Sequence, residues 1–338
     1  MRALAEFTRR HRWVWAALGV ALLWVALNVA MERFSLASIS GVARSASFLA
    51  IVALGQMFVV ATGRGNIDLS VASVVTLSAF ITVTLADGSN ATLPLALGAA
   101  LAMGAAVGLV NALLVVRLGI AAMIATLAMG YVLATATLMV NRSVRGFETA
   151  PALDWLASGR VGDVPVIAVL ACAATALAAF VVNRTAFGQT LSATGQNLRA
   201  AQLAGVRTGR TTTAAFVISG VCAALAGALL SANVGGAFLD MGTPYLLQSV
   251  GAVVLGGSLI FGGFSTALGT LLGAVLLVLI VTTMQIWGLP AGAQDVVQGV
   301  VIVAVLALAG GSAVRRRRPA PQAERALHSP PAPGKVED

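Results

Sequence analysis

Runs of about twenty apolar residues, separated by short polar segments, constrain this chain more than any other feature. A helix needs roughly 20 apolar residues to cross the hydrocarbon core of a bilayer. We therefore predict an all-α polytopic membrane protein with about ten transmembrane helices, some of them broken or re-entrant because several runs are short. The expected spans are 13–30, 45–62, 68–86, 93–116, 119–140, 164–183, 212–231, 248–263, 265–287 and 293–311.

Composition supports this class and excludes others. Of the 338 residues, 59% are hydrophobic and only 10% are charged, whereas soluble domains carry about 25% charged residues. The net charge of +9 does not indicate a nucleic-acid partner, because the arginines flank the apolar runs. We expect the basic segment Arg315–Arg318 to meet membrane lipid instead.

The same arginines predict orientation. Basic residues precede the first run, occupy the segment 184–211 and follow the last run, and such clusters stay in the cytoplasm. Ten crossings place all three on one side, with both termini cytoplasmic. We therefore divide the chain into a basic cytoplasmic N-terminus, a membrane domain and a tail that is basic and then disordered. Their expected bounds are 1–12, 13–311 and 312–338.

The loop 184–211 carries four arginines and no acidic residue. Its centre predicts a short helix bounded by glycines, in which Asn197 caps the N-terminus and the small Ala200 and Ala201 permit close approach of a partner. We expect the arginines to act as orientation signals rather than as specific contacts. The candidate partner-contacting residues are Gly195, Asn197, Arg199, Ala200, Ala201 and Gly205.

Polar residues and glycine pairs interrupt the apolar runs. Asp68 would be costly at membrane depth, which suggests a functional role; the alternative is an N-cap for the helix that follows. Asn111 would either line a path or bond between helices. The two glycine pairs predict a broken helix or close packing. The candidates for a translocation path or a helix break are Asp68, Ser70, Asn111, Asn233, Asp240, Gly256, Gly257, Gly262 and Gly263, of which Asn233 and Asp240 fall in an expected outer loop, 232–247.

Spans two to five and seven to ten have similar lengths, and an offset of five spans inverts their orientation. The segments 63–70 and 233–244, which follow spans two and seven, are each broken by glycine and each contain a single Asp. Transporters often build sites from such paired interruptions. The pattern is compatible with an inverted repeat.

Four segments resemble the permease subunits of bacterial ABC importers for monosaccharides, the ribose-type permease family. They occur in the family's order between about residues 45 and 310: Gly65–Ser73, Ala125–Gly130, Gly195–Val206, and Val254–Gly257 with the glycines at 262, 263, 269 and 273. This sequence departs from the family at Asn66, Ala72 and Ser265, where glycine is usual.

The resemblance implies a permease subunit of the bacterial inner membrane that imports a pentose, a hexose or a related polyol. Its implied partners are a periplasmic or lipid-anchored sugar-binding protein, a second permease subunit, identical or similar, and a cytosolic ATPase with two nucleotide-binding modules that would contact residues 195–205. The chain lacks a P-loop, and its single lysine is Lys335. We therefore expect the partner ATPase to bind ATP and Mg²⁺, and no catalytic residue, metal or cofactor in this chain.

Two alternatives stay open. The same importer class carries other cargoes, such as nucleosides, autoinducer-like sugars or branched amino acids. A self-contained secondary transporter or facilitator would need ion-coupling residues, and Asp68 is the only acidic candidate deep in a span. A membrane-embedded enzyme is disfavoured, because the histidines His11 and His328 lie in terminal segments.

Overall fold

The computed structural model describes residues 13–30, 36–142, 144, 146 and 148–316. The expected cytoplasmic N-terminus, 1–12, and the tail beyond 316 lie outside the described residues. The predicted all-α architecture is confirmed. The helices are α2 (Trp13–Ala30), α3 (Leu36–Ala61), α4 (Val71–Ala86), α5 (Leu93–Val116), α6 (Ala122–Asn141), α7 (Pro151–Ser158), α8 (Val166–Arg184), α9 (Ala186–Gln196), α10 (Leu198–Leu203), α11 (Thr208–Val234), α12 (Thr243–Leu255), α13 (Ala267–Ile286) and α14 (Ala291–Arg316).

Each expected span coincides with one helix, but the helices differ in length. Among the described residues, six are long and apolar enough to cross a membrane: α3, α5, α6, α8, α11 and α13. The apolar parts of α2, α4, α12 and α14 are shorter, at 10–17 residues. The protein therefore crosses a membrane several times, whereas the count of ten crossings stays a prediction.

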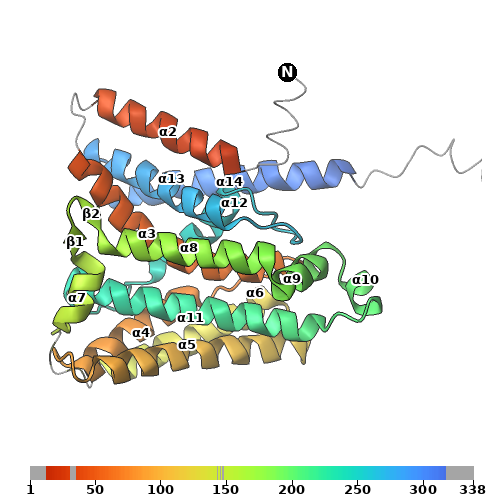
Figure 1. Cartoon of the computed structure of the whole chain (residues 1–338), viewed down its shortest axis with the longest axis horizontal. Helices are drawn as coiled ribbons and strands as arrows, with labels where there is room; N and C mark the ends of the chain where they lie inside the picture. Colours follow the sequence, from red (N-terminus) through yellow and green to blue (C-terminus); the bar gives the residue numbers. More distant parts are fainter. Residues whose placement is uncertain (1–12, 31–35, 143, 145, 147, 317–338) are drawn as a thin grey trace, which may run out of the picture.

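Helices α3 and α11 form the centre of the molecule (Figure 1). Helix α11 packs against α3, α4 and α5, and α3 packs against α8, α12 and α13. Helix α7 and a two-residue hairpin, β1 (Arg160–Val161) with β2 (Val164–Pro165), lie at one end of the bundle. Helices α9 and α10 project from the opposite end. The bundle thus carries short helices at both ends.

Glycine permits a very close helix contact between α5 and α11. A Cβ atom on Gly104 would lie 2.4 Å from the carbonyl oxygen of Gly220, and a Cβ atom on Gly220 would lie 2.0 Å from that of Gly104. The two backbones therefore touch directly. Such contacts give close van der Waals packing in a membrane, where no hydrophobic driving force exists between helices.

The expected span 248–263 is wrong at its C-terminal end. Helix α12 ends at Leu255, and Gly257, Gly262 and Gly263 have φ values of 87°, 83° and 83°. This left-handed conformation favours glycine because it has no Cβ atom. The predicted break is thus confirmed: a short helix is followed by a loop, 256–266.

A second break separates α3 from α4. Three consecutive residues, Gly63, Arg64 and Gly65, have φ values of 81°, 61° and 73°. Helix α4 begins only at Val71, so Asp68 precedes the helix, whereas we expected the span to start there.

One further expectation needs correction. Helix α11 continues to Val234, so Asn233 is helical and does not lie in a loop. Between α6 and α8 the chain forms α7 and the β1–β2 hairpin. Helix α14 continues to Arg316, and the expected boundary between the membrane domain and the tail, at 311–312, stays a prediction. In both proposed repeat units, α3 to α6 and α11 to α14, a long helix is followed by a short one. This agrees with an inverted repeat, but the repeat itself stays a prediction.

Because of the α5–α11 contact, alanine substitutions at two glycines of α5 should affect stability differently. Gly104→Ala should destabilise the protein by roughly 1–3 kcal/mol, because the added methyl group forces the two backbones apart. Gly98→Ala should be neutral or slightly stabilising, because nothing lies within 4 Å of its Cβ position. Thermal denaturation in detergent, followed by size-exclusion chromatography, measures both. Equal midpoints for the two variants would contradict the close contact.

Candidate functional site

The loop between α8 and α11 forms two short helices rather than the single helix expected over Gly195–Gly205. Gly195 belongs to α9, which ends at Gln196. Asn197 then has extended backbone angles, φ −157° and ψ 99°, and its Oδ1 accepts a hydrogen bond from the backbone N–H of Ala200 at 3.1 Å. This satisfies a free N–H group of the first turn of α10. The predicted cap is therefore present, and it separates α10 from α9.

The outward face of helix α10 carries a small side chain, that of Ala200. Ala200 is exposed and Ala201 is buried against the bundle, although both were expected to allow a partner to approach. Arg199 is exposed beside them, and Gly205 follows the helix with a φ value of 81°. Leu203 is 85% exposed and was not predicted. Its signal in the sequence is an isolated large apolar residue in a polar loop.

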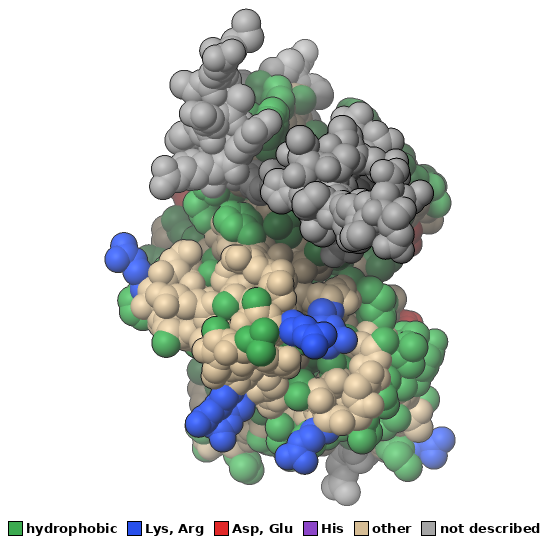
Figure 2. Space-filling view, turned by 90° about the vertical axis from the view of Figure 1, so that its right-hand side faces the viewer, with side chains coloured by type: hydrophobic (Ala, Val, Ile, Leu, Met, Phe, Trp, Pro, Cys, Tyr) green, Lys and Arg blue, Asp and Glu red, His purple; other side chains and the backbone are tan. Residues whose placement is uncertain are grey.

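The end that bears α9 and α10 is strongly basic. Figure 2 views this end and shows basic side chains spread across it. Its exposed arginines come from the loop after α3, the end of α5 and the segment α8 to α11: Arg64, Arg117, Arg184, Arg199, Arg207 and Arg210. The opposite end carries acidic residues around α7, among them Asp87, Glu148, Asp154 and Asp163.

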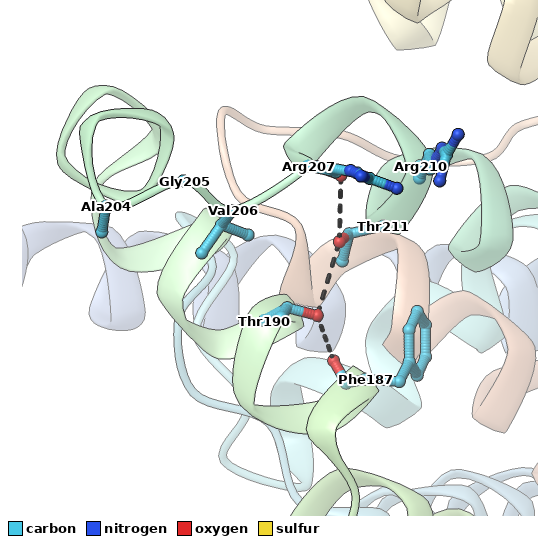
Figure 3. Close-up of a pocket in the computed structure, with 8 residues that line it drawn as sticks. All are labelled: Phe187, Thr190, Ala204, Gly205, Val206, Arg207, Arg210 and Thr211. Carbon is cyan, nitrogen blue, oxygen red and sulfur yellow. Dashed lines mark hydrogen bonds between the residues drawn. The ribbon is translucent and has the colours of Figure 1, made fainter.

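A hollow of about 460 Å³ separates α9 from the start of α11. Figure 3 shows the hydrogen bonds that cross its floor. The Thr211 hydroxyl lies 3.4 Å from both the carbonyl oxygen of Arg207 and the hydroxyl of Thr190, and the Thr190 hydroxyl donates to the carbonyl oxygen of Phe187 at 2.9 Å. These bonds brace α9 against α11, so the two helices hold the loop as one unit.

Helix α9 also contacts the loop 256–266 and the end of α3. The backbone N–H of Gly263 donates to the carbonyl oxygen of Ala61 at 3.1 Å. The Gly263 carbonyl oxygen accepts from the Ser192 hydroxyl at 2.7 Å and from the Gln196 amide at 3.3 Å. A Cβ atom on Gly195 would lie 2.1 Å from the Ala61 carbonyl oxygen. Three segments far apart in sequence therefore meet backbone to backbone, and we call this contact the glycine junction.

A buried polar cluster lies in the break between α3 and α4. The Asp68 carboxylate is 1% exposed. Its Oδ1 accepts from the backbone N–H and the hydroxyl of Ser70, at 3.0 and 2.6 Å, and its Oδ2 accepts from the Ser219 hydroxyl at 2.8 Å. The Asn111 amide donates to the Ser70 hydroxyl at 2.8 Å. Three residues predicted separately are thus brought together with a fourth, from α11.

The alternative interpretation of Asp68 was an N-cap, but its side chain does not bond the first turn of α4. It holds the backbone N–H of Ser70, the residue before the helix, and so ties the loop to α11. Two residues that the sequence did not single out complete this arrangement. With its amide oriented to suit its neighbours, Gln56 bonds the backbone N–H and carbonyl of Asp68 at 3.1 and 3.3 Å. The Thr126 hydroxyl accepts from the Leu69 N–H at 2.9 Å.

The remaining predicted site residues lie away from this cluster. Asn233 lies near α7, where its Oδ1 accepts a 3.4 Å hydrogen bond from the Ser158 hydroxyl. Asp240 lines a cavity of about 340 Å³ between α4 and α6. Its loop folds back onto α4, because the Gly242 N–H donates to the Thr76 hydroxyl at 3.0 Å. Within the described ranges, no three His, Cys, Asp or Glu side chains lie close enough to hold a metal ion.

The buried cluster predicts a selective loss of stability. Asp68→Ala leaves the Ser70 N–H and the Ser219 hydroxyl without their acceptor, and each unpaired buried group costs about 1–3 kcal/mol. Asp68→Asn retains an acceptor and should lose less. Asp240→Ala removes an exposed carboxylate and should change the denaturation midpoint little. If Asp68→Ala and Asp240→Ala denature at the same temperature, the cluster does not hold the break.

Comparison with known proteins places this arrangement in a family. A family model described as "Branched-chain amino acid transport system / permease component" matches residues 38–306. The autoinducer 2 import system permease protein LsrC of Shigella flexneri is 32% identical over 316 residues, 91% of this chain and 89% of that protein. LsrC of Enterobacter sp. (strain 638) is 34% identical over 314 residues, 92% of this chain and 88% of that protein.

A third relative, LsrC of Yersinia pseudotuberculosis, is 33% identical over 310 residues, 91% of this chain and 87% of that protein. No solved structure matches the chain. The matches cover nearly the whole bundle, including both helix breaks and the α9–α10 loop. The chain therefore belongs to this permease family and is a membrane-spanning permease subunit of an ABC importer.

Proposed function

We propose that this subunit carries autoinducer 2 or a monosaccharide inward across the inner membrane, and that a separate ATPase drives it by binding α10. A periplasmic or lipid-anchored binding protein delivers the cargo to the opposite end, and a second permease subunit completes the pair. The partner ATPase binds ATP and Mg²⁺. The observation that carries this proposal is α10, an outward-facing capped helix connected through α9 to the interior of the bundle.

The distribution of charge supports the orientation. Basic residues flanking membrane spans remain on the cytoplasmic side, and the described part of the α9–α10 end exposes Arg64, Arg117, Arg184, Arg199, Arg207 and Arg210. This end therefore faces the cytoplasm in the proposed importer, where an ATPase is available. The acidic end around α7 then faces outward, toward the binding protein.

The glycine junction supports coupling between the ATPase and the transport path. A displacement of α10 moves α9, because Asn197 alone separates them. Helix α9 is bonded to Gly263, and Gly263 is bonded to Ala61 at the end of α3. Seven residues further along the chain lies Asp68. Movement of the loop thus reaches both helix breaks through two short hydrogen bonds, from the Ser192 hydroxyl to Gly263 and from the Gly263 N–H to Ala61.

The relatives and the resemblance support the choice of cargo. The curated relatives are named for autoinducer 2 import, whereas the sequence motifs resemble monosaccharide permeases. The family model carries a third name, that of branched-chain amino acid transport. Autoinducer 2 and a pentose, hexose or polyol are therefore the proposed cargoes, and a branched-chain amino acid is the alternative within the same class.

The coupling proposal is tested at Ala200. Ala200→Asp places an acidic side chain on the exposed face of α10, and we expect it to reduce co-purification of the ATPase at least tenfold and to abolish uptake. The matched control is Ala152→Asp, which makes the same change at an exposed position of α7, at the other end of the bundle. The control should retain the ATPase. Normal ATPase binding by Ala200→Asp would contradict the assignment.

The cargo proposal is tested in proteoliposomes that contain this chain, its ATPase and its binding protein. Labelled autoinducer 2, D-ribose and L-leucine are supplied separately, with and without ATP. We expect ATP-dependent accumulation of autoinducer 2 or D-ribose only. Uptake of L-leucine would support the alternative cargo. Uptake by this chain alone would show a facilitator instead.

A further inference from the structure

A cavity of about 720 Å³ lies at the α10 end of the bundle. Its walls come from the turn after α3, the loop between α5 and α6, helix α10 and the start of α11. Ligand pockets in proteins measure about 300–1,000 Å³ and are mostly apolar with a few placed polar groups. The cavity is large enough for one small molecule and several waters.

The two sides of the cavity differ in chemistry. The α5–α6 side is apolar and includes Val115, Ile120 and Met123. The opposite side carries hydroxyl, amide and guanidinium groups, and none of the described residues that line the cavity is a carboxylate. Its polar lining consists of Thr62, Arg64, Asn66, Gln202, Thr208 and Thr212. A molecule with hydroxyl groups on one face and carbon–hydrogen bonds on the other complements both sides.

Two polar groups in this lining have no protein partner among the described residues, and both are open to the cavity rather than sealed in the protein. Threonines in these helices usually donate to a preceding carbonyl oxygen, as Thr213 does to Gly209 at 2.9 Å. The Thr212 hydroxyl, one residue earlier, makes no hydrogen bond with described residues, although Thr212 is only 8% exposed. The hydroxyl is open to the cavity, so it is available to a ligand.

Asn66 supplies the second free group. It is 9% exposed, and its amide nitrogen donates to the Thr62 hydroxyl at 2.9 Å. Its Oδ1 forms no hydrogen bond within the described part of the chain and lines the cavity. The backbone that positions Asn66 is strained, because Arg64 adopts a φ of 61° between two glycines. Strain of this kind concentrates at functional sites.

Helix α10 is itself a wall of the cavity. Leu198 and Gln202 line it, and the Gln202 amide donates to the Thr208 hydroxyl at the start of α11 at 3.2 Å. A partner that pushes on the exposed Ala200 therefore also moves the residues that enclose the cavity. Occupancy of the cavity and the position of α10 are linked through shared residues.

We propose that this cavity binds one small, uncharged, polyhydroxylated molecule, held by Asn66 and Thr212 and enclosed by α10. The role of the cavity in transport rests on the proposed function: the cavity is the last position that the cargo occupies before release. The outer cavity beside Asp240 lies along the same helix, α6. The residues 122–124 and 134–138 of α6 line the inner and outer cavities, roughly 15 Å apart at 1.5 Å per residue. The buried Asp68 cluster lies between them.

The test measures binding to the purified chain in lipid nanodiscs, without ATPase or binding protein. The probes are autoinducer 2, D-ribose, D-glucose and ribitol, detected by saturation-transfer NMR. We expect saturable binding of at least one probe, weakened about tenfold by Thr212→Val, which removes one hydrogen bond while keeping the side-chain shape. Asn66→Leu should weaken it similarly. Thr213→Val, a matched change outside the cavity, should leave it unchanged.

Cysteine labelling gives a second readout that misfolding cannot imitate. With Cys172 and Cys222 replaced by alanine, Thr212→Cys should react with a small hydrophilic thiol reagent, and the bound probe should slow the reaction. Thr213→Cys should show no protection by the probe. Absence of saturable binding by every probe, or equal effects of the changes at 212 and 213, would overturn the proposal.

The outcomes separate this inference from the proposed function. If probe binding depends on Thr212 but no ATP-dependent uptake occurs, the cavity is a binding site and its role in transport is wrong. If uptake occurs with unchanged probe binding and unchanged rate in Thr212→Val, the importer stands and the cavity assignment falls.

Discussion

The constraint on which this structure depends is that a backbone polar group inside a bilayer has no water to bond with. Within a helix the backbone groups bond one another, so the backbone groups at each break need hydrogen-bonding partners from another element. The break after α3 is closed by Asp68 and Thr126, the loop after α11 by Thr76, and the loop after α12 by Ala61. These few hydrogen bonds tie the broken segments to α3, α4, α6 and α11.

The breaks also determine where polar cavities occur. Both cavities that α6 lines lie beside an interrupted segment. The inner cavity lies beside 62–66 and the outer cavity beside 239–243. An unbroken apolar bundle offers a small polar molecule no hydrogen-bonding partners, whereas a break exposes backbone and hydroxyl groups at membrane depth. The same irregularity that costs stability therefore creates cavities lined by hydrogen-bonding groups.

Much of the fold could be predicted from the sequence, because hydropathy and the glycine pairs report local properties. They indicated all the long helices, the break after Leu255 and the cap at Asn197. The meeting of Asp68, Ser70 and Asn111 with Ser219 could not be predicted, since Ser219 is one of many hydroxyls in α11 and only three-dimensional packing selects it. Gln56 gave a usable signal, as the single amide in the apolar run of α3. The glycine junction could not be predicted, because it depends on close contacts between the backbones of Ala61, Gly195 and Gly263, which lie far apart in the sequence.

Gly263 has both of its backbone polar groups committed, the N–H to Ala61 and the carbonyl to Ser192. The end of α3, the end of α9 and the loop after α12 therefore share one hinge point and lack independent degrees of freedom. If a partner displaces α9, as proposed, the displacement passes through Gly263 to the end of α3 and to the loop after α12 together. A single residue without a side chain thus joins three segments at this end of the bundle.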